Sequence, residues 1–281
     1  MFTSGNCTIV PVQGAFCVDN REWQPNKGKG LMNATKVVGL IPARYGSTRL
    51  PGKPLALIAG KPMIQHVYER CADAPSLAAA WVCTDDSRVY DTVKDFGGNA
   101  VMTRPDHISG TDRVAEAAEQ LDADIVVNIQ GDQPFVHPDM LNEVVTPLLQ
   151  EKPADVSTLK VRITHEADLH NPAVVKVVTD HAGNALYFSR SLIPYPREKL
   201  SHDVYEHAGT YAYRKDTLLR LTQLAPTVLE QVESLEQLRW LQHGLRIAVV
   251  ESQISDPARH GFSVDTPEDL ARAEDMMLSS E

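Results

Sequence analysis

The chain has 281 residues, of which 43% are hydrophobic, and it carries a formal net charge of -10 at pH 7. This length and apolar content suffice for one large domain, or for a domain with an added lobe. This net negative charge argues against nonspecific binding to nucleic acid or to an anionic membrane surface. No apolar run in the sequence is long enough to span a bilayer.

Residues 1–31 differ in composition from the rest, with scattered Gly, Asn, Gln and Pro and no apolar periodicity. They lack the charged start, the continuous apolar core and the cleavage site of a secretory signal. We therefore predict a disordered extension or a misassigned start, with a docked terminal arm as the alternative. The cysteines show no C-x-x-C spacing, so we expect neither a zinc site nor a disulfide framework, and a reducing compartment such as the cytoplasm. They are Cys7, Cys17, Cys71 and Cys83.

From Lys36 onward, strand and helix patterns alternate. This alternation predicts a nucleotide-binding α/β core over residues 36–153, with a mostly parallel sheet covered by helices on both faces. The predicted strands are 37–41, 80–84, 100–103 and 124–129, and the predicted helices are 63–72, 88–96 and 111–120.

After Pro153 the pattern changes to consecutive strands, which predicts an inserted β-rich lobe over residues 154–215. Its predicted strands are 157–163, 174–179, 185–188 and 205–213. Residues 216–281 then return to the α/β core, with helices at 216–223 and 232–242, a strand at 247–251 and a last helix from Pro267. Asp265 or Thr266 could cap that last helix.

The stretch VGLIPARYGSTRLPGKPL, residues 38–55, places Arg44, Arg49 and Lys53 in a loop after an apolar strand. Open α/β sheets bind ligands at the carboxyl ends of their strands, so this loop is predicted to grip phosphate. It is not a Walker loop, because its glycines are spaced differently and Pro54 follows Lys53, and it lacks the G-x-G-x-x-G fingerprint. The alternative interpretation is a solvated basic turn.

A second motif, IVVNIQGDQP, delivers Gln130 and Asp132 to the same edge of the sheet. A carboxylate among phosphates is costly unless a cation lies between them, and Mg²⁺ prefers oxygen ligands, so Asp132 is predicted to bind this metal. A third motif, SVDTPEDL, contains Asp265, which on its own pattern is better explained as a helix cap.

These motifs, together with GKPMIQHVYERC, FGGNAVMTRPDHISGTDRVAE, HAGTYAYR and LEQLRWLQHG, resemble those of the cytidylyltransferases that activate 3-deoxy-D-manno-octulosonate (KDO) with CTP. The resemblance covers roughly residues 37–277 in unchanged motif order. It implies a Rossmann-like nucleotidyltransferase fold with a mostly parallel, mixed central sheet flanked by helices. It also implies a smaller β-rich lobe that forms the contact of a homodimer and one wall of the sugar site.

The resemblance assigns the site residues. It pairs Asp132 and Asp265 on Mg²⁺, and charge accounting for phosphoryl transfer makes Arg44, Lys53 and Asp132 the catalytic residues. The predicted nucleotide-binding residues are Ala43, Arg44, Arg49, Lys53, Arg104, Ser109, Gly110 and Gln130. Those predicted for the acidic eight-carbon sugar are Arg190, His207, Tyr211, Glu236 and Gln237.

Three positions depart from the pattern of the family: Gln133 replaces a usual Glu, Thr210 a usual Ile and Ser263 a usual Gly. The QGDQP form resembles a subgroup that acts on 8-amino-8-deoxy-KDO, so KDO is the expected acceptor and its 8-amino analogue the alternative. The expected products are CMP-KDO, for the lipopolysaccharide inner core, and pyrophosphate. Two further functions stay open on these residues: a non-catalytic nucleotide-sugar binder, and a pyrophosphorylase that uses a sugar 1-phosphate.

Overall fold

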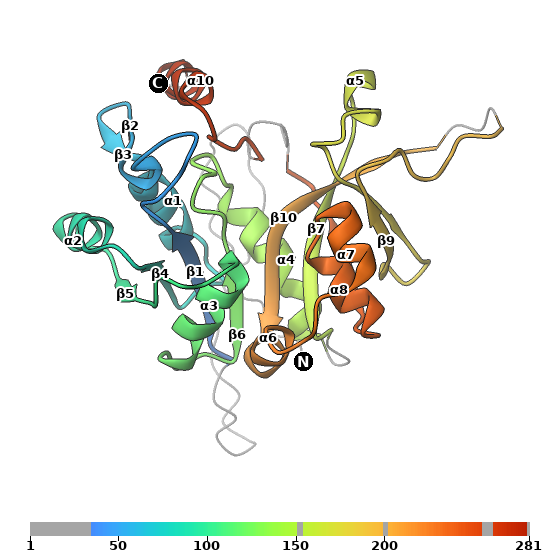
Figure 1. Ribbon diagram of the computed structural model, residues 1–281, viewed down its shortest axis with the longest axis horizontal. Coiled ribbons are helices and arrows are strands. Elements are labelled where there is room, and N and C mark those ends of the chain that lie inside the picture. The colour runs from blue at the N-terminus through green and yellow to red at the C-terminus, as the bar shows by residue number, and fades with distance from the viewer. Residues whose placement is uncertain (1–34, 151–153, 199–201, 255–260, 280–281) are drawn as a thin grey trace, which may run out of the picture. The chain divides into compact units, whose positions relative to one another are not determined.

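A nine-stranded mixed sheet runs through the centre of the protein (Figure 1). The computed structural model describes residues 35–150, 154–198, 202–254 and 261–279, so the predicted extension at 1–31 lies outside the described residues. The strands of the sheet are β1 (Val37–Ala43), β4 (Ala79–Thr84), β5 (Ala100–Met102), β6 (Ile125–Asn128), β7 (Val156–Arg162), β8 (Lys176–Thr179), β9 (Ala185–Ser189), β10 (Tyr205–Arg214) and β11 (Ile247–Glu251).

Short and long helices connect these strands, and two residue pairs, β2 (Leu57–Ile58) and β3 (Lys61–Pro62), form a separate antiparallel hairpin. Among the described helices, none combines the length and apolar character needed to cross a bilayer. The helices are η1 (Lys53–Leu55), α1 (Met63–Ala72), α2 (Ser87–Asp95), α3 (Gly110–Glu119), α4 (Pro138–Leu149), α5 (Glu166–Leu169), α6 (Lys215–Leu221), α7 (Val228–Glu233), α8 (Gln237–Gln242) and α10 (Pro267–Leu278).

The strand order is β11-β7-β10-β6-β1-β4-β5, and β8 and β9 branch from β10. The chain builds outward from β1 through β4 to β5 and then returns to the other side of β1 with β6, all four strands being parallel. β10 is antiparallel to both β6 and β7, and β7 is parallel to β11. The predicted mostly parallel, mixed sheet is therefore confirmed, and the order of its strands reverses between β1 and β6.

Alternation along β1 explains why helices cover both faces of the sheet. Ile41 and Ala43 point into a core shared with α1, α2 and α4, whereas Val38 and Leu40 point into a second core shared with α3, α6 and α8. A smaller third core, which includes Met63, packs α10 against the hairpin of β2 and β3. This third core fixes the segment that carries Asp265.

The predicted lobe at 154–215 does not form a sheet of its own. Inside the central sheet β10 pairs with β6 and β7, and β7 pairs with β11. β8 pairs with β10, and β9 pairs with β8. A strand pattern read along the chain cannot reveal this, because its place in the sheet depends on pairing between residues far apart in sequence.

The prediction of a single helix at 232–242 is wrong. Ser234 adopts a left-handed backbone with φ 52° and ends α7, and α8 begins three residues later. The sequence prediction placed no helix at Pro138–Leu149, where α4 lies. Thr266 caps α10 in a reciprocal capping box with Asp269, which confirms one of the two predicted caps.

Candidate active site

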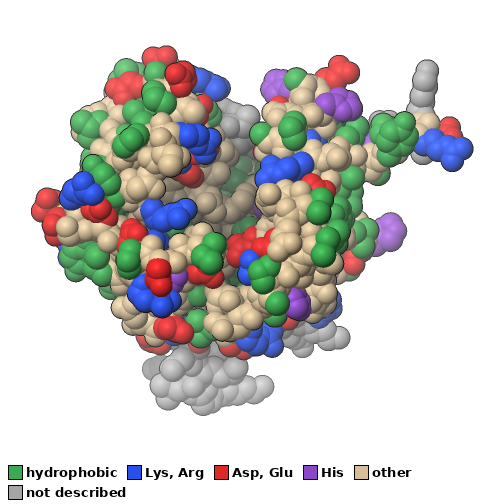
Figure 2. Space-filling model, in the orientation of Figure 1, with side chains coloured by type: hydrophobic (Ala, Val, Ile, Leu, Met, Phe, Trp, Pro, Cys, Tyr) green, Lys and Arg blue, Asp and Glu red, His purple; other side chains and the backbone are tan. Residues whose placement is uncertain are grey.

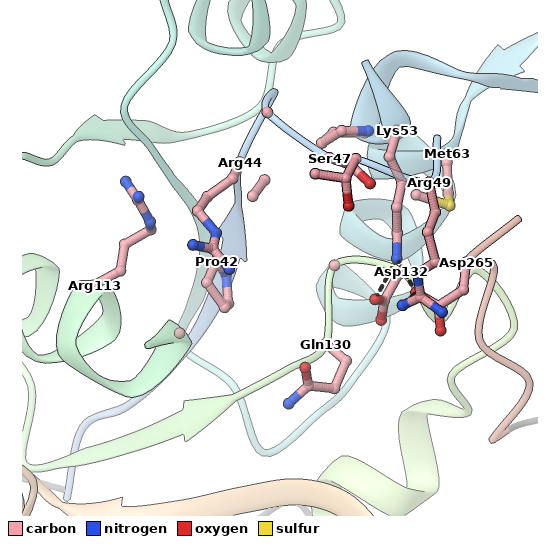
Figure 3. Close-up of a pocket in the computed structure, with 16 residues that line it drawn as sticks. Pro42, Arg44, Ser47, Arg49, Lys53, Met63, Arg113, Gln130, Asp132 and Asp265 are labelled. Atoms are coloured by element: carbon pink, nitrogen blue, oxygen red, sulfur yellow. Dashed lines mark hydrogen bonds and ion pairs between the residues drawn. The ribbon is translucent and has the colours of Figure 1, made fainter. Parts of the chain in front are cut away.

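A pocket of about 540 Å³ opens at the carboxyl ends of β1 and β6 (Figure 3). This is the place where the strand order reverses, and in open α/β sheets such a switch point is where ligands bind. Its walls come from the loop after β1, the start of α3, the turn at residues 130–132 and Asp265. Four segments far apart in sequence therefore meet around one hollow.

The centre of this pocket is an ammonium group held by two carboxylates. Lys53 Nζ lies 2.7 Å from Asp132 Oδ2 and 2.9 Å from Asp265 Oδ1, and Arg49 Nη2 lies 2.9 Å from the same Asp265 oxygen. Figure 3 shows these side chains pointing toward one another from separate elements. Lys53 is only 13% exposed, so this lysine is not part of a solvated basic turn, the alternative interpretation, whereas Arg49 is 64% exposed.

These contacts shift the protonation equilibria of the cluster. Partial burial opposes the charge on Lys53, but the two carboxylates outweigh burial and raise the pKa of this lysine above its usual value. Burial likewise acts to raise the pKa of Asp265, but Lys53 and Arg49 outweigh it and the pKa falls. Lys53 and Asp265 are therefore both charged at neutral pH.

Backbone contacts place the two carboxylates side by side. The N–H of Val264 donates to the carbonyl oxygen of Asp132 over 2.9 Å, which ties the chain before α10 to the end of β6. A Cβ atom on Gly131 would lie 2.7 Å from the Pro42 carbonyl oxygen, so only glycine allows the ends of β1 and β6 to approach this closely. Gln133 adds a bond from its side-chain amide to the Gly261 carbonyl oxygen.

The loop that carries the cations is rigid. Gly52 has φ 70°, a conformation that favours glycine, and its N–H donates to the Tyr45 carbonyl oxygen over 3.1 Å. The guanidinium of Arg88 stacks on the Tyr45 ring at 3.4 Å, and Pro54 is buried in the first turn of the short helix η1. A donor carried on this loop can therefore meet an anion with little loss of conformational freedom.

Arg44, Ala43, Gln130 and Gly110 line the same pocket, as the nucleotide-binding prediction requires. Arg44 forms no ion pair with any residue that the structure describes, so its positive charge is available to an anion. Gln130 donates to the Gly209 carbonyl oxygen over 3.1 Å.

Two predicted nucleotide-binding residues do not line the pocket. Ser109 caps α3 by accepting from the Asp112 N–H at 3.1 Å, and Arg104 is exposed beside Asp106 and Glu116. Arg113, one turn into α3, does line the pocket although the sequence analysis did not select it. Its position in SGTDR, within the first turns after the predicted helix cap, was the signal that could have identified it.

The residues predicted to bind the sugar lie outside this pocket, around β10 and α8. Tyr211 is buried, with its ring 5.3 Å from His207 and 5.1 Å from Trp240. Glu236 accepts a 2.7 Å hydrogen bond from Thr111, the residue after Gly110, so this region adjoins the start of α3. Gln237 is buried in the first turn of α8.

Arg190 is occupied by the protein itself. Its guanidinium donates to the carbonyl oxygens of Glu233, Pro172 and Ser234 at 2.7, 2.9 and 3.3 Å. These bonds hold β9 to the end of α7. A role for Arg190 toward a sugar carboxylate remains a prediction, as do the roles of the other four residues.

A mostly parallel, mixed α/β sheet with a rigid cationic loop and converging carboxylates at its switch point is the architecture of a nucleotidyltransferase. The family described as cytidylyltransferase matches residues 38–247 of this chain. The chain therefore belongs to the cytidylyltransferase family.

Individual relatives agree with this assignment. The 3-deoxy-manno-octulosonate cytidylyltransferases of Solibacter usitatus and Geobacter metallireducens are each 49% identical over 246 residues, which cover 87% and 84% of this chain and 96% and 95% of theirs. A solved structure of CMP:2-keto-3-deoxy-manno-octonic acid synthetase complexed with CTP superposes with a TM-score of 0.83 at 45% identity, covering 88% of this chain and all of that one. A cytidylyltransferase from Leptospira borgpetersenii, at 18% identity and a TM-score of 0.58, shares the fold.

The imidazole of His207 should stay neutral in mildly acidic solution. Burial lowers its pKa from 6.5 to about 3, so the unfolded chain takes up this proton first and stability falls as the pH drops below 6.5. We expect the ring nitrogens of His207 to show no titration by NMR between pH 7 and about 5. The unfolding free energy of His207→Gln should depend less steeply on pH over that range, and equal slopes would contradict this.

Proposed function

We propose that this protein transfers CMP from CTP to KDO, releasing pyrophosphate. The observation that carries the proposal is the Lys53, Asp132 and Asp265 cluster at the switch point beside Arg44, because such a site suits a polyphosphate and a divalent cation. The names of the relatives, which span nearly the same length, support KDO as the acceptor. The reaction would take place in the cytoplasm and serve lipopolysaccharide synthesis.

The reaction needs no side-chain nucleophile. A hydroxyl oxygen of the sugar forms a bond to the α-phosphorus, the bond from that phosphorus to the bridging oxygen of the β-phosphate breaks, and pyrophosphate leaves while the hydroxyl proton passes to solvent. Negative charge grows on the leaving group and on the equatorial oxygens of the α-phosphate. Lys53 and Arg44, which line the pocket together with Arg49, would neutralise that charge.

The donor set at the site fits Mg²⁺. Asp132 and Asp265 both reach one ammonium nitrogen, so both can reach one small cation, and carboxylate oxygens are the ligands that Mg²⁺ prefers. No third acidic, histidine or cysteine side chain joins them among the described residues, which leaves other coordination positions for phosphate and water. A bound Mg²⁺ would polarise the α-phosphate and favour deprotonation of the attacking hydroxyl.

The 8-amino analogue of KDO remains the alternative acceptor. Gln133, the residue that suggested it, donates to the Gly261 carbonyl oxygen over 3.3 Å, and a glutamate could not make this bond. The side-chain amide of Gln133 therefore helps to hold the segment before α10 against the end of β6. The contact does not depend on which sugar binds.

Pyrophosphate release with CTP and Mg²⁺ tests the proposed function. We expect turnover with KDO, less efficient turnover with the 8-amino analogue when kcat/KM values are compared, and none with a sugar 1-phosphate. Reversal of the first two would make the analogue the substrate. Turnover with the sugar 1-phosphate alone would indicate a pyrophosphorylase, and no turnover with any acceptor would indicate a non-catalytic binder.

Asp132→Asn should lower kcat by about 100-fold or more while CTP binding weakens much less, because the carboxylate acts mainly in the transition state. Asp91→Asn, on the exposed face of α2, removes the same charge away from the pocket and should leave kcat unchanged. The measurement is steady-state kinetics with titration calorimetry of CTP. Full activity of the Asp132 variant would remove this residue from the mechanism.

An exposed apolar face supports the proposal that the protein is a homodimer. Val228 and Val232, one turn apart on α7, are 69% and 78% exposed, and Leu186 on β9 is 62% exposed. Hydrogen bonds from Ser189 and Arg190 to Glu233 hold β9 and α7 together, and Figure 2 shows hydrophobic side chains gathered over these elements on the right-hand flank. Contiguous exposed apolar residues of this kind are typical of protein interfaces.

Val228→Glu combined with Val232→Glu should therefore shift the protein from dimer to monomer in light scattering after gel filtration. Leu278→Glu on α10, which is 55% exposed in the starting protein, adds charge elsewhere and should leave the dimer intact. A monomeric starting protein, or a dimer that survives both valine substitutions, would exclude this face as the interface.

A further inference from the structure

Within the described part of the chain, a single hydrogen bond joins the start of α3 to the start of α8, two helices that cover the same face of the sheet (Figure 1). Thr111 Oγ1 donates to Glu236 Oε2 over 2.7 Å. Thr111 is 5% exposed and does not line the nucleotide pocket, although Gly110 before it does. Glu236 occupies the N-cap position of α8. The bond therefore runs from the edge of the nucleotide pocket to the residues predicted to bind the sugar.

The half-buried carboxylate of Glu236 depends on this bond. Arg239 lies near enough to attract the charge of Glu236, but its guanidinium donates to Glu230 instead, with Nε 2.8 Å from Oε2. Burial raises the pKa of Glu236 above its usual value, and the hydrogen bond from Thr111 is the largest effect that opposes the rise. Thr111 is therefore the hydrogen-bond donor that holds this carboxylate among the residues that the structure describes.

The two oxygens of the carboxylate have different surroundings. Oε2 is fixed by Thr111, whereas Oε1 accepts no hydrogen bond from any described residue. The branched side chain of Thr111 has few rotamers, and its burial restricts them further, so the direction of its hydroxyl is set. Gln237, the next residue after Glu236, is buried in the first turn of α8 and fixes the backbone there. One oxygen is thus held in place while the other stays open to a ligand donor.

We propose that Thr111 is a positioning residue for the acceptor sugar: it holds Glu236 so that Oε1 accepts a hydrogen bond from a sugar hydroxyl. The inference rests on the proposed function and on the predicted contact between Glu236 and the sugar. A carboxylate that is already oriented loses less conformational freedom on binding, so the sugar binds more tightly. Because Thr111 directly follows Gly110 of the nucleotide pocket, the start of α3 serves both substrates.

Calorimetric titration with KDO tests this role, in the presence of Mg²⁺ and the α,β-methylene analogue of CTP so that no turnover occurs. Thr111→Val removes the donor at nearly constant shape and should weaken KDO binding about tenfold, as expected for a lost hydrogen bond to a charged group. Thr111→Ser keeps the hydroxyl and should bind KDO like the starting protein. Affinity for the CTP analogue should change by no more than about twofold in both variants, because Thr111 does not line the nucleotide pocket.

Thr146→Val is the matched control. Thr146 is exposed on α4, and its hydroxyl donates to the Asn142 carbonyl oxygen over 3.0 Å, so this change also removes a threonine hydrogen bond. It should leave KDO binding unchanged. In steady-state kinetics, Thr111→Val should raise the KM for KDO with a smaller change in kcat, whereas Thr111→Ser and the control should change neither.

A second set of variants serves if Thr111→Val fails to fold. Thr111→Ala removes the same donor and takes its place in the titration. Glu236→Ala removes the carboxylate, and adding Thr111→Ala to it should cost no further KDO affinity, because the two residues act through one bond. Thermal unfolding of each variant shows whether a loss of binding reflects a loss of structure.

Two results would overturn the positioning role: KDO affinity that survives loss of the hydroxyl in a folded variant, or equal losses for KDO and the CTP analogue, as a merely structural bond between the helices would give. The proposed function can fail separately. If KDO binding depends on Thr111 but KDO releases no pyrophosphate from CTP, the positioning role stands and the reaction assignment is wrong. If the starting protein does not bind KDO, both are wrong.

Discussion

The structure of the site depends on one ammonium group that two carboxylates share. Lys53 comes from the loop after β1, Asp132 from the end of β6 and Asp265 from the chain before α10, so their meeting fixes three segments relative to one another. A buried or half-buried charge is stable only when it is paired, and removing any one member leaves an uncompensated charge. The same three groups give the pocket a mixed polarity, suited to a metal on one side and to phosphates on the other.

The sheet brings these groups together before any side chain is considered. Because β1 and β6 are parallel neighbours, both deliver their following loops to one edge, and the reversal of strand order leaves room between those loops. Gly131 lets the two loops touch, and the Val264 to Asp132 backbone bond adds the third segment. Backbone geometry therefore sets the position of the site at this edge of the sheet. The side chains around it decide which ligand the site can bind.

Local sequence patterns predicted most of the strands and the basic loop, because apolar alternation and glycine–proline punctuation are local signals. They did not reveal that β7 and β10 belong to the central sheet, which depends on pairing across more than 40 residues. Asp265 appeared to be only a helix cap until the family resemblance paired it with Asp132. Arg113 was passed over because a charged residue within a helix usually faces solvent, whereas here Asp85 and Thr103 compensate its burial.

Asp132 and Asp265 lie far apart in the sequence, so the Lys53 cluster of the active site can be completed only late in synthesis of the chain. Synthesis proceeds from the amino terminus, and domains begin to fold as they emerge from the ribosome. The central strands, including β11, can pair before residues 261–279 appear, but Lys53 then has only one of its two carboxylates. In a nascent chain in that state Lys53 would lack its contact to Asp265, and the late docking of α10 would complete the cluster.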